Sequence, residues 1–389
     1  MKKVIIILLI FSLVFTSFFI FKKEEEKTNK NISVILETEE GNIETNTFPS
    51  KKDYEYLSTE CENTSDNINT IFNESSWKLN LSVEEESIDG DFFCTIYFKE
   101  YPTINELIFK NNEIKNAPVT TPGSEAATTD EGLIKGGIDD YNSNMYYFRG
   151  KVENNYIKLG EDLWRIVKVN GDGSVKIILN DLVLDENGEA VLTQYNTESY
   201  GATISEVLNL LNFENSRLLV ELKKYYNEKL LDYDKIIENT KFCTDLSYPT
   251  YTTIIYFSTF TRLNKLTAPV SKCSSTSYIY EEKIGSLTSD EIVYAGAASY
   301  VTNSNKILNK SLYLHINNYK FKYFHTISPN FYYIMSDKTS SNIVYDFELG
   351  GLVGSDLENN FGIRPVISIK GDIKAKGMGT SNNPYELIF

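Results

Sequence analysis

The sequence predicts an α+β protein in three parts: an N-terminal membrane helix, a small all-β sandwich and a larger α+β domain. Three observations predict this class. Residues 4–21 form a predominantly apolar run. Short segments with alternating apolar and polar residues occupy residues 32–100. From residue 128 onward a hairpin pattern gives way to helical periodicity and then to further strand-like segments, without a repeated βαβ unit.

Residues 1–23 are predicted to be a signal anchor or a signal peptide. Two lysines precede the apolar run, which would span about 27 Å as a helix and so match a hydrocarbon core. We favour a retained anchor over a cleaved signal because no small-residue cleavage site follows the run. A buried core helix is a further alternative. Residues 24–31, EEEKTNKN, are predicted to be a charged tether.

The charge balance excludes one class of partner. The chain carries 54 Asp and Glu against 38 Lys and Arg, a formal net charge of −16. Such a chain repels phosphate backbones and anionic lipid surfaces. We therefore expect no nucleic-acid partner, and no sequence feature leads us to predict a cofactor.

Four cysteines, Cys61, Cys94, Cys243 and Cys273, indicate the redox compartment. They form no CxxC motif and the chain has only two histidines, which argues against a zinc site. Sequential pairing would place one disulfide in each candidate domain, each contributing roughly 3.5–4 kcal/mol on a loop-entropy model; four buried free thiols are the alternative. Because cysteines of this kind indicate disulfides, we place the chain after the apolar run outside the cell. The lysines flanking the run favour the opposite orientation.

Residues 32–100 predict a small β-sandwich. The segments SVILET, WKLNLSV and FFCTIYF are strand-like, and EEGN and DGD are turn signals. Cys61 near a strand end and Cys94 in the last strand are placed to join the two sheets. Residues 101–127 are rich in Pro, Thr, Ser and Gly and predict a linker that includes a short helix at 104–112.

Residues 128–389 predict the second domain. LWRIVKVNGDGSVKIIL is typical of a hairpin whose turn is NGDG, and alternation places Trp164 and Ile166 on one face of it. Residues 203–239 carry apolar residues at spacings of three and four, which predicts one or two amphipathic helices. SLTSDEIVYAG predicts a short helix capped by Ser286 or Thr288.

An ordered series of motifs resembles a known family. TDEGL, YYFRG, VENNY, LWRIVKVNGDGSVKIIL, FCTD, IGSLTSDEIVYAG, TISP, FGIRPVISIK and GTSNNPYEL follow one another along residues 128–389. Together they resemble exported surface proteins of gut-dwelling Firmicutes, whose carboxy-terminal domain is similar to the formylglycine-generating, sulfatase-modifying branch of the C-type lectin fold. The resemblance implies a C-type-lectin-like α+β domain in which Cys243 and Cys273 match the family's FCxD and KC positions. It also implies that residues 32–100 are an Ig-like β-sandwich.

The chain departs from the functional motifs of related proteins. The formylglycine-generating branch uses a copper-binding cysteine pair near the end of the fold, whereas no cysteine follows Cys273. The EPN, QPD and WND motifs of calcium-dependent sugar-binding lectins are absent, as are GxSxG, HExxH, P-loop and dinucleotide motifs. We therefore predict no catalytic residue and no metal ligand.

Two groups of residues are catalytic alternatives. His325 lies close in sequence to Ser328, and a Ser–His pair can activate a nucleophile. The adjacent carboxylates at 139–140 and 290–291 are candidate acid–base pairs. We interpret the histidine as a core or surface residue and the carboxylates as solvated.

Aromatic density favours a binding role. The chain has 27 Tyr and 22 Phe, and tyrosine offers a rigid contact face with a polar tip. The predicted binding patch comprises Tyr323, Phe324, His325, Tyr332 and Tyr333.

Two further residues, Trp164 and Arg364, are predicted to be structural, and we expect Arg364 to hold the closing strand through a buried hydrogen bond. The sequence thus predicts a cell-surface-anchored, non-catalytic binding or adhesion protein. Its expected partners are an extracellular glycan or protein and, through the N-terminal helix, the membrane. The alternatives are a wall-associated structural or scaffolding protein and an enzyme of unknown class on a formylglycine-generating-enzyme-like fold.

Overall fold

The computed structural model divides the chain into two compact units, Met1–Tyr101 and Pro102–Phe389. It describes residues 30–63, 68–83, 92–123, 126–198, 203–248, 254–265, 268–299, 312–316, 323–329, 331–333, 341–346 and 350–389.

The fold class needs one correction, which concerns the N-terminal membrane helix. Within the described ranges, no helix is long and apolar enough to cross a membrane. The longest α-helix among them has 9 residues, far short of the roughly 20 that a span requires. The described chain begins instead with strand β1 (Lys30–Thr38), so the last two residues of the predicted tether belong to a strand. Residues 1–29, which hold the predicted helix and the rest of the tether, lie outside the described residues.

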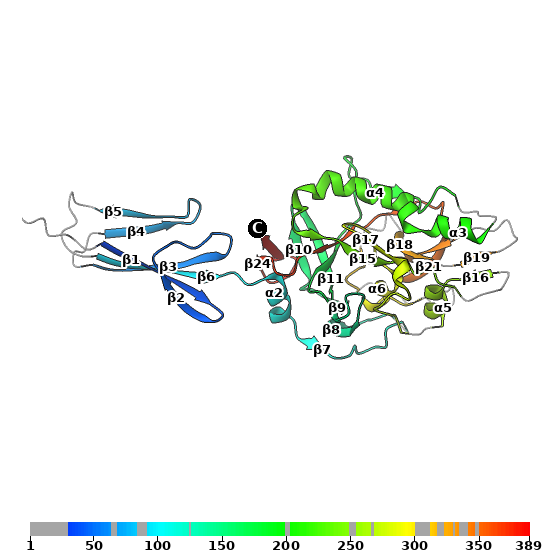
Figure 1. Ribbon diagram of the computed structural model, residues 1–389, viewed down its shortest axis with the longest axis horizontal. Coiled ribbons are helices and arrows are strands. Elements are labelled where there is room, and N and C mark those ends of the chain that lie inside the picture. The colour runs from blue at the N-terminus through cyan, green and yellow to red at the C-terminus, as the bar shows by residue number, and fades with distance from the viewer. Residues whose placement is uncertain are drawn as a thin grey trace, which may run out of the picture. The chain divides into compact units, whose positions relative to one another are not determined.

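Unit 1 consists of a four-stranded sheet and a separate hairpin (Figure 1). The sheet has the order β2-β1-β6-β3, in which β1 runs parallel to β6 and the other neighbours are antiparallel. β4 and β5 form the hairpin. The remaining strands span Gly41–Thr45 (β2), Tyr54–Asn63 (β3), Ile68–Asn73 (β4), Lys78–Val83 (β5) and Phe92–Glu100 (β6).

The core of unit 1 follows from strand alternation. Val34 of β1 and Ile96 and Phe98 of β6 are fully buried and pack with Phe72 of β4. Trp77, at the hairpin turn, adopts a left-handed φ of 52° that is rare for a bulky residue. Its ring packs 5.2 Å from the rings of Phe72 and Phe98, which holds the hairpin on the sheet.

The predicted disulfide of unit 1, Cys61–Cys94, is confirmed, but it does not join two sheets. Cys61 of β3 and Cys94 of β6 lie directly opposite each other on neighbouring strands of the same sheet, with their Cα atoms 4.1 Å apart. The bridge therefore fixes the register of these two strands.

The segment 101–127, predicted to be a linker, is largely folded into unit 2. Helix α2 (Ile104–Asn111) begins with a capping box in which Thr103 and Glu106 satisfy each other's backbone N–H groups. Ile104 and Ile108 are fully buried in the core of unit 2. Strand β7 (Ile114–Lys115) then pairs with the large sheet. Composition alone suggested a linker because the apolar residues of the segment are few, but those of α2 at 104, 107 and 108 are buried.

A ten-stranded sheet forms the centre of unit 2 (Figure 1). Its main path has the order β14-β23-β12-β11-β10-β25-β24, while β9 pairs with β11 and β8, and β7 pairs with β8. Its strands beyond β7 are β8 (Asp130–Ile138), β9 (Asn144–Gly150), β10 (Tyr156–Leu159), β11 (Asp162–Val169), β12 (Val175–Leu179), β14 (Ile237–Glu238), β23 (Val366–Ile369), β24 (Lys374–Lys376) and β25 (Tyr385–Ile388).

The predicted hairpin at the centre of this sheet is confirmed. β11 and β12 pair antiparallel, and fully buried Trp164 lies opposite Leu179. Gly173 adopts the left-handed φ of 89° that the tight turn requires. At Gly171 any side chain would collide with Asp139, because a Cβ atom would lie 2.5 Å from its Oδ1.

Smaller sheets complete the β structure of unit 2. A five-stranded sheet has the order β13-β22-β18-β20-β21, and two ladders pair β15 with β17 and β16 with β19. The strands are β13 (Leu192–Thr193), β15 (Thr240–Cys243), β16 (Ile254–Tyr256), β17 (Ile279–Glu282), β18 (Tyr323–Pro329), β19 (Phe331–Tyr333), β20 (Ser341–Asp346), β21 (Gly351–Asp356) and β22 (Phe361–Gly362).

Short helices pack on these sheets, so the α+β class is compatible with unit 2. The periodic stretch 203–239 is several helical pieces: α3 (Ile204–Leu211), α4 (Arg217–Tyr225) and a π-helical turn at Tyr226–Leu230, with 3-10 turns at Phe213–Asn215 and Leu231–Tyr233. The other helices are α5 (Ser258–Asn264), α6 (Ser289–Tyr294) and a 3-10 turn at Thr276–Tyr278. Thr288, one of the two predicted caps, begins α6.

Candidate functional site

Two of the five residues of the predicted aromatic patch are not exposed. Phe324 and His325 are fully buried, because β18 is an interior strand of the five-stranded sheet. Tyr323 is half-buried, with its ring 4.9 Å from that of Phe361. Tyr332 and Tyr333 belong to β19, whose backbone pairs with β16, and their side chains lie outside the description. Phe324 and His325 therefore do not belong to an exposed binding patch.

His325 serves the core and does not activate Ser328. Its Nε2 lies 2.8 Å from the carbonyl oxygen of Thr193, which can only accept, so Nε2 carries the proton. Its Nδ1 then accepts from the Asn342 amide at 3.4 Å. Burial lowers the pKa of His325 to about 4. The Ser328 hydroxyl oxygen accepts instead from the backbone N–H of Ser289 at 2.9 Å.

Arg364 is buried and its guanidinium binds main-chain oxygens ahead of the closing strand β23. It donates twice to the carbonyl of Leu179, at 3.0 and 2.9 Å, and once each to those of Asn180 and Leu314, at 2.9 and 2.8 Å. Burial lowers its pKa to about 10. The bonds to Leu179 and Asn180 tie Arg364, two residues before β23, to the end of β12, where Leu179 is the last residue.

The carboxylates interpreted as solvated are mostly buried: Asp139, Asp290 and Glu291 are each less than one-tenth exposed. Asp139 Oδ2 accepts from the N–H of Gly171 at 2.8 Å and so holds the hairpin turn. Burial raises the pKa of Asp290 more than the guanidinium of Arg262 lowers it. The sequence could not distinguish these acids from exposed ones, because the partners that bury them, Gly171, Arg262 and Lys176, are distant in the chain.

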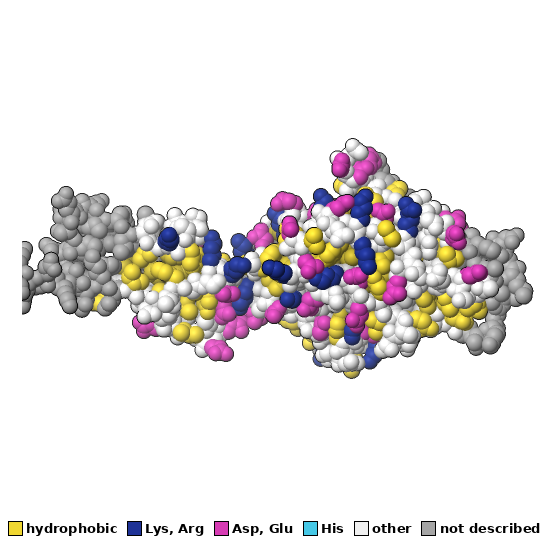
Figure 2. Space-filling model, turned by 45° about the horizontal axis from the view of Figure 1, so that its top comes forward, with side chains coloured by type: hydrophobic (Ala, Val, Ile, Leu, Met, Phe, Trp, Pro, Cys, Tyr) yellow, Lys and Arg dark blue, Asp and Glu magenta, His cyan; other side chains and the backbone are white. Residues whose placement is uncertain are grey.

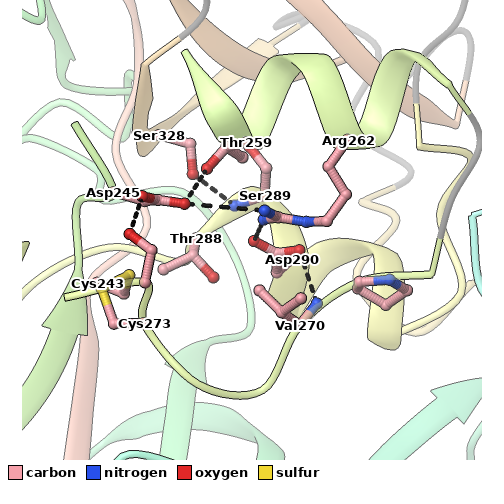
Figure 3. A network of polar contacts seen from close by, with 12 residues as sticks. Cys243, Asp245, Thr259, Arg262, Val270, Cys273, Thr288, Ser289, Asp290 and Ser328 are labelled. Atoms are coloured by element: carbon pink, nitrogen blue, oxygen red, sulfur yellow. Dashed lines mark hydrogen bonds and ion pairs between the residues drawn. A yellow bond between two sulfur atoms is a disulfide. The ribbon is translucent and has the colours of Figure 1, made fainter. Parts of the chain in front are cut away.

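A network of polar contacts joins α5, α6 and the chain around the second disulfide (Figure 3). Arg262 of α5 contacts Asp290 of α6 at 2.5 Å and lies 3.8 Å from Asp245. Asp245 also accepts from the hydroxyls of Ser247, Thr259 and Ser274. Each carboxylate thus connects two segments that are far apart in sequence.

Glu291 occupies the most basic part of this interior. Its Oε1 lies 2.7 Å from Lys176 Nζ and 3.0 Å from Lys168 Nζ, while Oε2 accepts from the N–H of Thr288. Burial on its own would raise the pKa of Glu291, but these two ammonium groups hold it well below the ordinary value. Burial lowers the pKa of Lys176 to about 8.

The Cys243–Cys273 disulfide, predicted from sequence, is confirmed and anchors a loop over a small cavity. The loop is held by Ser271, which donates to the Ile138 carbonyl at 2.8 Å, and by the Cys273 N–H, which donates to Asp140 at 2.9 Å. The cavity beneath is about 40 Å³. That volume accommodates a few water molecules and no substrate of ordinary size, so this region is a structural clamp.

An open groove of about 520 Å³ runs beside α4 and its π-helical extension. Its apolar lining comes from Val183, Leu184, Val191, Tyr225 and Ile363, of which Leu184 is the most exposed at 51%. Its charged and polar lining comes from the 185–187 turn on one side and from the helix on the other. On the side of the turn these residues are Asp185, Glu186 and Asn187. On the side of the helix they are Glu221, Lys224, Glu228 and Lys229.

The groove continues along α4 into a second recess of about 360 Å³, which shares Glu221. This recess is lined by Asn196, Asn215 and Arg217, and by Val220, which is 64% exposed. From residue 217 to residue 229 a helix rises about 18 Å. The two recesses together therefore form an elongated surface feature, which we call the α4 groove. Figure 2 shows acidic and basic side chains interspersed over the upper part of unit 2, where α4 lies.

Local structure explains why the groove stays open. The Asp185 side chain accepts from the N–H groups of Asn187 and Glu189, each at 2.9 Å, and Gly188 adopts a φ of 76°. These contacts fix the turn at one wall, while the π-helical turn at Tyr226–Leu230 widens the helix at the other. Sequence reasoning missed this site; DENGE at 185–189 is a recognisable turn, but nothing in it indicates that it faces α4.

Comparison with family models, with curated proteins and with solved structures finds no match to this chain. The resemblance to exported surface proteins with an Ig-like and a C-type-lectin-like domain therefore stays a prediction.

Proposed function

We propose that the protein is an extracellular binding protein that holds a macromolecular ligand by non-covalent contacts in the α4 groove. The groove itself carries the proposal. It is open, elongated and about 520 Å³ in its larger part, and it combines an apolar floor with charged walls. Recesses of this volume are common among ligand sites.

The disulfides support the extracellular placement. Each unit contains one, and stable disulfides persist in oxidising compartments. The contacts of the buried titratable side chains favour a binding role over a catalytic one. Glu291, Asp290 and His325, the described groups with the most unusual surroundings, each contact scaffold residues and none lines the α4 groove.

An array of host and microbial glycans and extracellular-matrix proteins, probed with the purified protein, tests the proposal. We expect binding to at least one member. Val220→Trp fills the smaller recess and should abolish binding of a ligand that spans both recesses. Ile138→Trp is the matched control, because Ile138 is 55% exposed and lies on β8, away from α4. Binding that survives Val220→Trp, or self-assembly with no array member bound, would refute the proposal.

A further inference from the structure

The charges of the α4 groove identify a class of ligand, on the assumption that the groove is the binding site. Four carboxylates line its larger part, Asp185, Glu186, Glu221 and Glu228, against two ammonium groups, Lys224 and Lys229. No ion pair joins any of these six side chains to another residue that the structure describes. Asp185 already accepts from two backbone N–H groups, so Glu186, Glu221 and Glu228 are the carboxylates that remain for a cationic partner.

The shape of the groove favours an extended peptide over a sugar chain. Saccharides are commonly held on an exposed aromatic face. Tyr225, the one aromatic residue among the lining residues, is 7% exposed, and its hydroxyl donates to Asp162 at 3.0 Å. The ring is therefore almost entirely buried and offers no open platform of that kind.

The dimensions match a short strand. An extended peptide rises about 3.3 Å per residue and points successive side chains in opposite directions. About 18 Å along the helix thus accommodates roughly five or six residues. One set of side chains would meet the apolar surface offered by Leu184, which is 51% exposed, and by half-buried Val191. The alternate set would meet the carboxylates of the walls.

We propose that the α4 groove takes an extended segment of a partner protein in which apolar and basic side chains alternate. The floor buries the apolar side chains. Glu186 on the turn and Glu228 on the π-helical segment, one on each wall, pair with the basic ones. The positive charge of Lys224 repels the basic side chains of the same ligand and so limits its affinity.

Fluorescence anisotropy with a labelled heptapeptide of alternating Leu and Arg tests the inference. We expect the Glu186→Gln/Glu228→Gln double variant to bind it roughly threefold to tenfold more weakly, as expected for exposed ion pairs. Lys224→Gln should bind it more tightly, and binding should weaken as salt is raised. Glu113→Gln, a change at an exposed acid outside the groove, is the control and should leave affinity unchanged.

Three probes separate failure of this inference from failure of the proposed function. A heptapeptide of alternating Leu and Glu should bind poorly; equal binding of both peptides, or no effect of the double variant, overturns the inference. Cellohexaose or chitohexaose bound in a manner that Val220→Trp abolishes would overturn it while leaving the proposed function intact. No binding by any peptide, glycan or matrix protein would overturn both.

Discussion

Lys176 Nζ lies 2.7 Å from Glu291 Oε1, and both side chains are buried. The pair connects strand β12 with the first turn of α6, two elements more than a hundred residues apart in sequence. Because Lys168 also contacts Glu291, one carboxylate holds two strands of the large sheet and the helix together.

We expect Lys176→Met to destabilise unit 2 by about 2–4 kcal/mol, because it removes one partner of a buried pair. Lys168 remains beside Glu291 and limits the loss. Urea unfolding of the purified variant measures it. Lys376→Met removes the exposed Lys376–Glu386 pair and should cost less than about 1 kcal/mol. Equal losses in the two variants would contradict the role given to Lys176.

Stability should fall as the pH drops from about 6.5 toward 4. The folded-state pKa of His325 is lowered to about 4 by burial, so the unfolded chain binds the proton more readily in this interval. The contribution of neutral His325 to stability is fully present above the pKa of the unfolded chain. It is lost as the pH falls toward the pKa of the folded protein. It amounts to about 3 kcal/mol for a shift of this size.

Unfolding of His325→Gln across the same pH range checks this assignment. Glutamine retains a donor for the Thr193 carbonyl but does not titrate, so the variant should lose most of the slope between pH 6.5 and 4. An unchanged slope would assign the effect to other groups.

Arg364→Lys should destabilise unit 2 by about 3 kcal/mol although the charge is kept. Lysine has no planar fork and cannot reach the carbonyls of Leu179, Asn180 and Leu314 at once, which leaves buried acceptors unsatisfied. Thermal unfolding with Arg217→Lys as the exposed control measures the difference. A loss no larger than that of the control would show that the hydrogen bonds contribute little.

Replacing Cys243 and Cys273 together with serine should lower the unfolding free energy of unit 2 by roughly 3–4 kcal/mol on the loop-entropy model. The clamp over the small cavity should loosen as well, because the Cys273 N–H bond to Asp140 depends on the loop's position. Hydrogen exchange of the Val270 N–H, which donates to Asp290, reports on the loop. Unchanged exchange and stability would contradict the role of the bridge.

Local patterns predicted well the elements that depend on neighbours in sequence. The Trp164–Leu179 hairpin was predictable because its turn residues and strand alternation lie within one stretch. The Thr288 cap was predictable because a capping box spans only four residues. The disulfide pairs were predicted by taking the cysteines in order, and both are present.

Features that depend on tertiary neighbours were not predictable in the same way. The sequence predicted a short helix at 104–112, but only the tertiary structure shows that the core of unit 2 buries Ile104 and Ile108. Phe324 and His325 looked like surface aromatics because only the strand order shows that β18 is interior. The α4 groove needs the 185–189 turn to lie opposite the helix, and no pattern within either segment indicates this.

The central claim, that the α4 groove is the binding face, is tested most directly by hydrogen–deuterium exchange with and without the tightest-binding array member. We predict that protection on binding is concentrated in residues 183–191 and 217–229, and that Val220→Trp removes it. Protection confined to unit 1 or to the loop at 268–275, with exchange beside α4 unchanged, would contradict the claim.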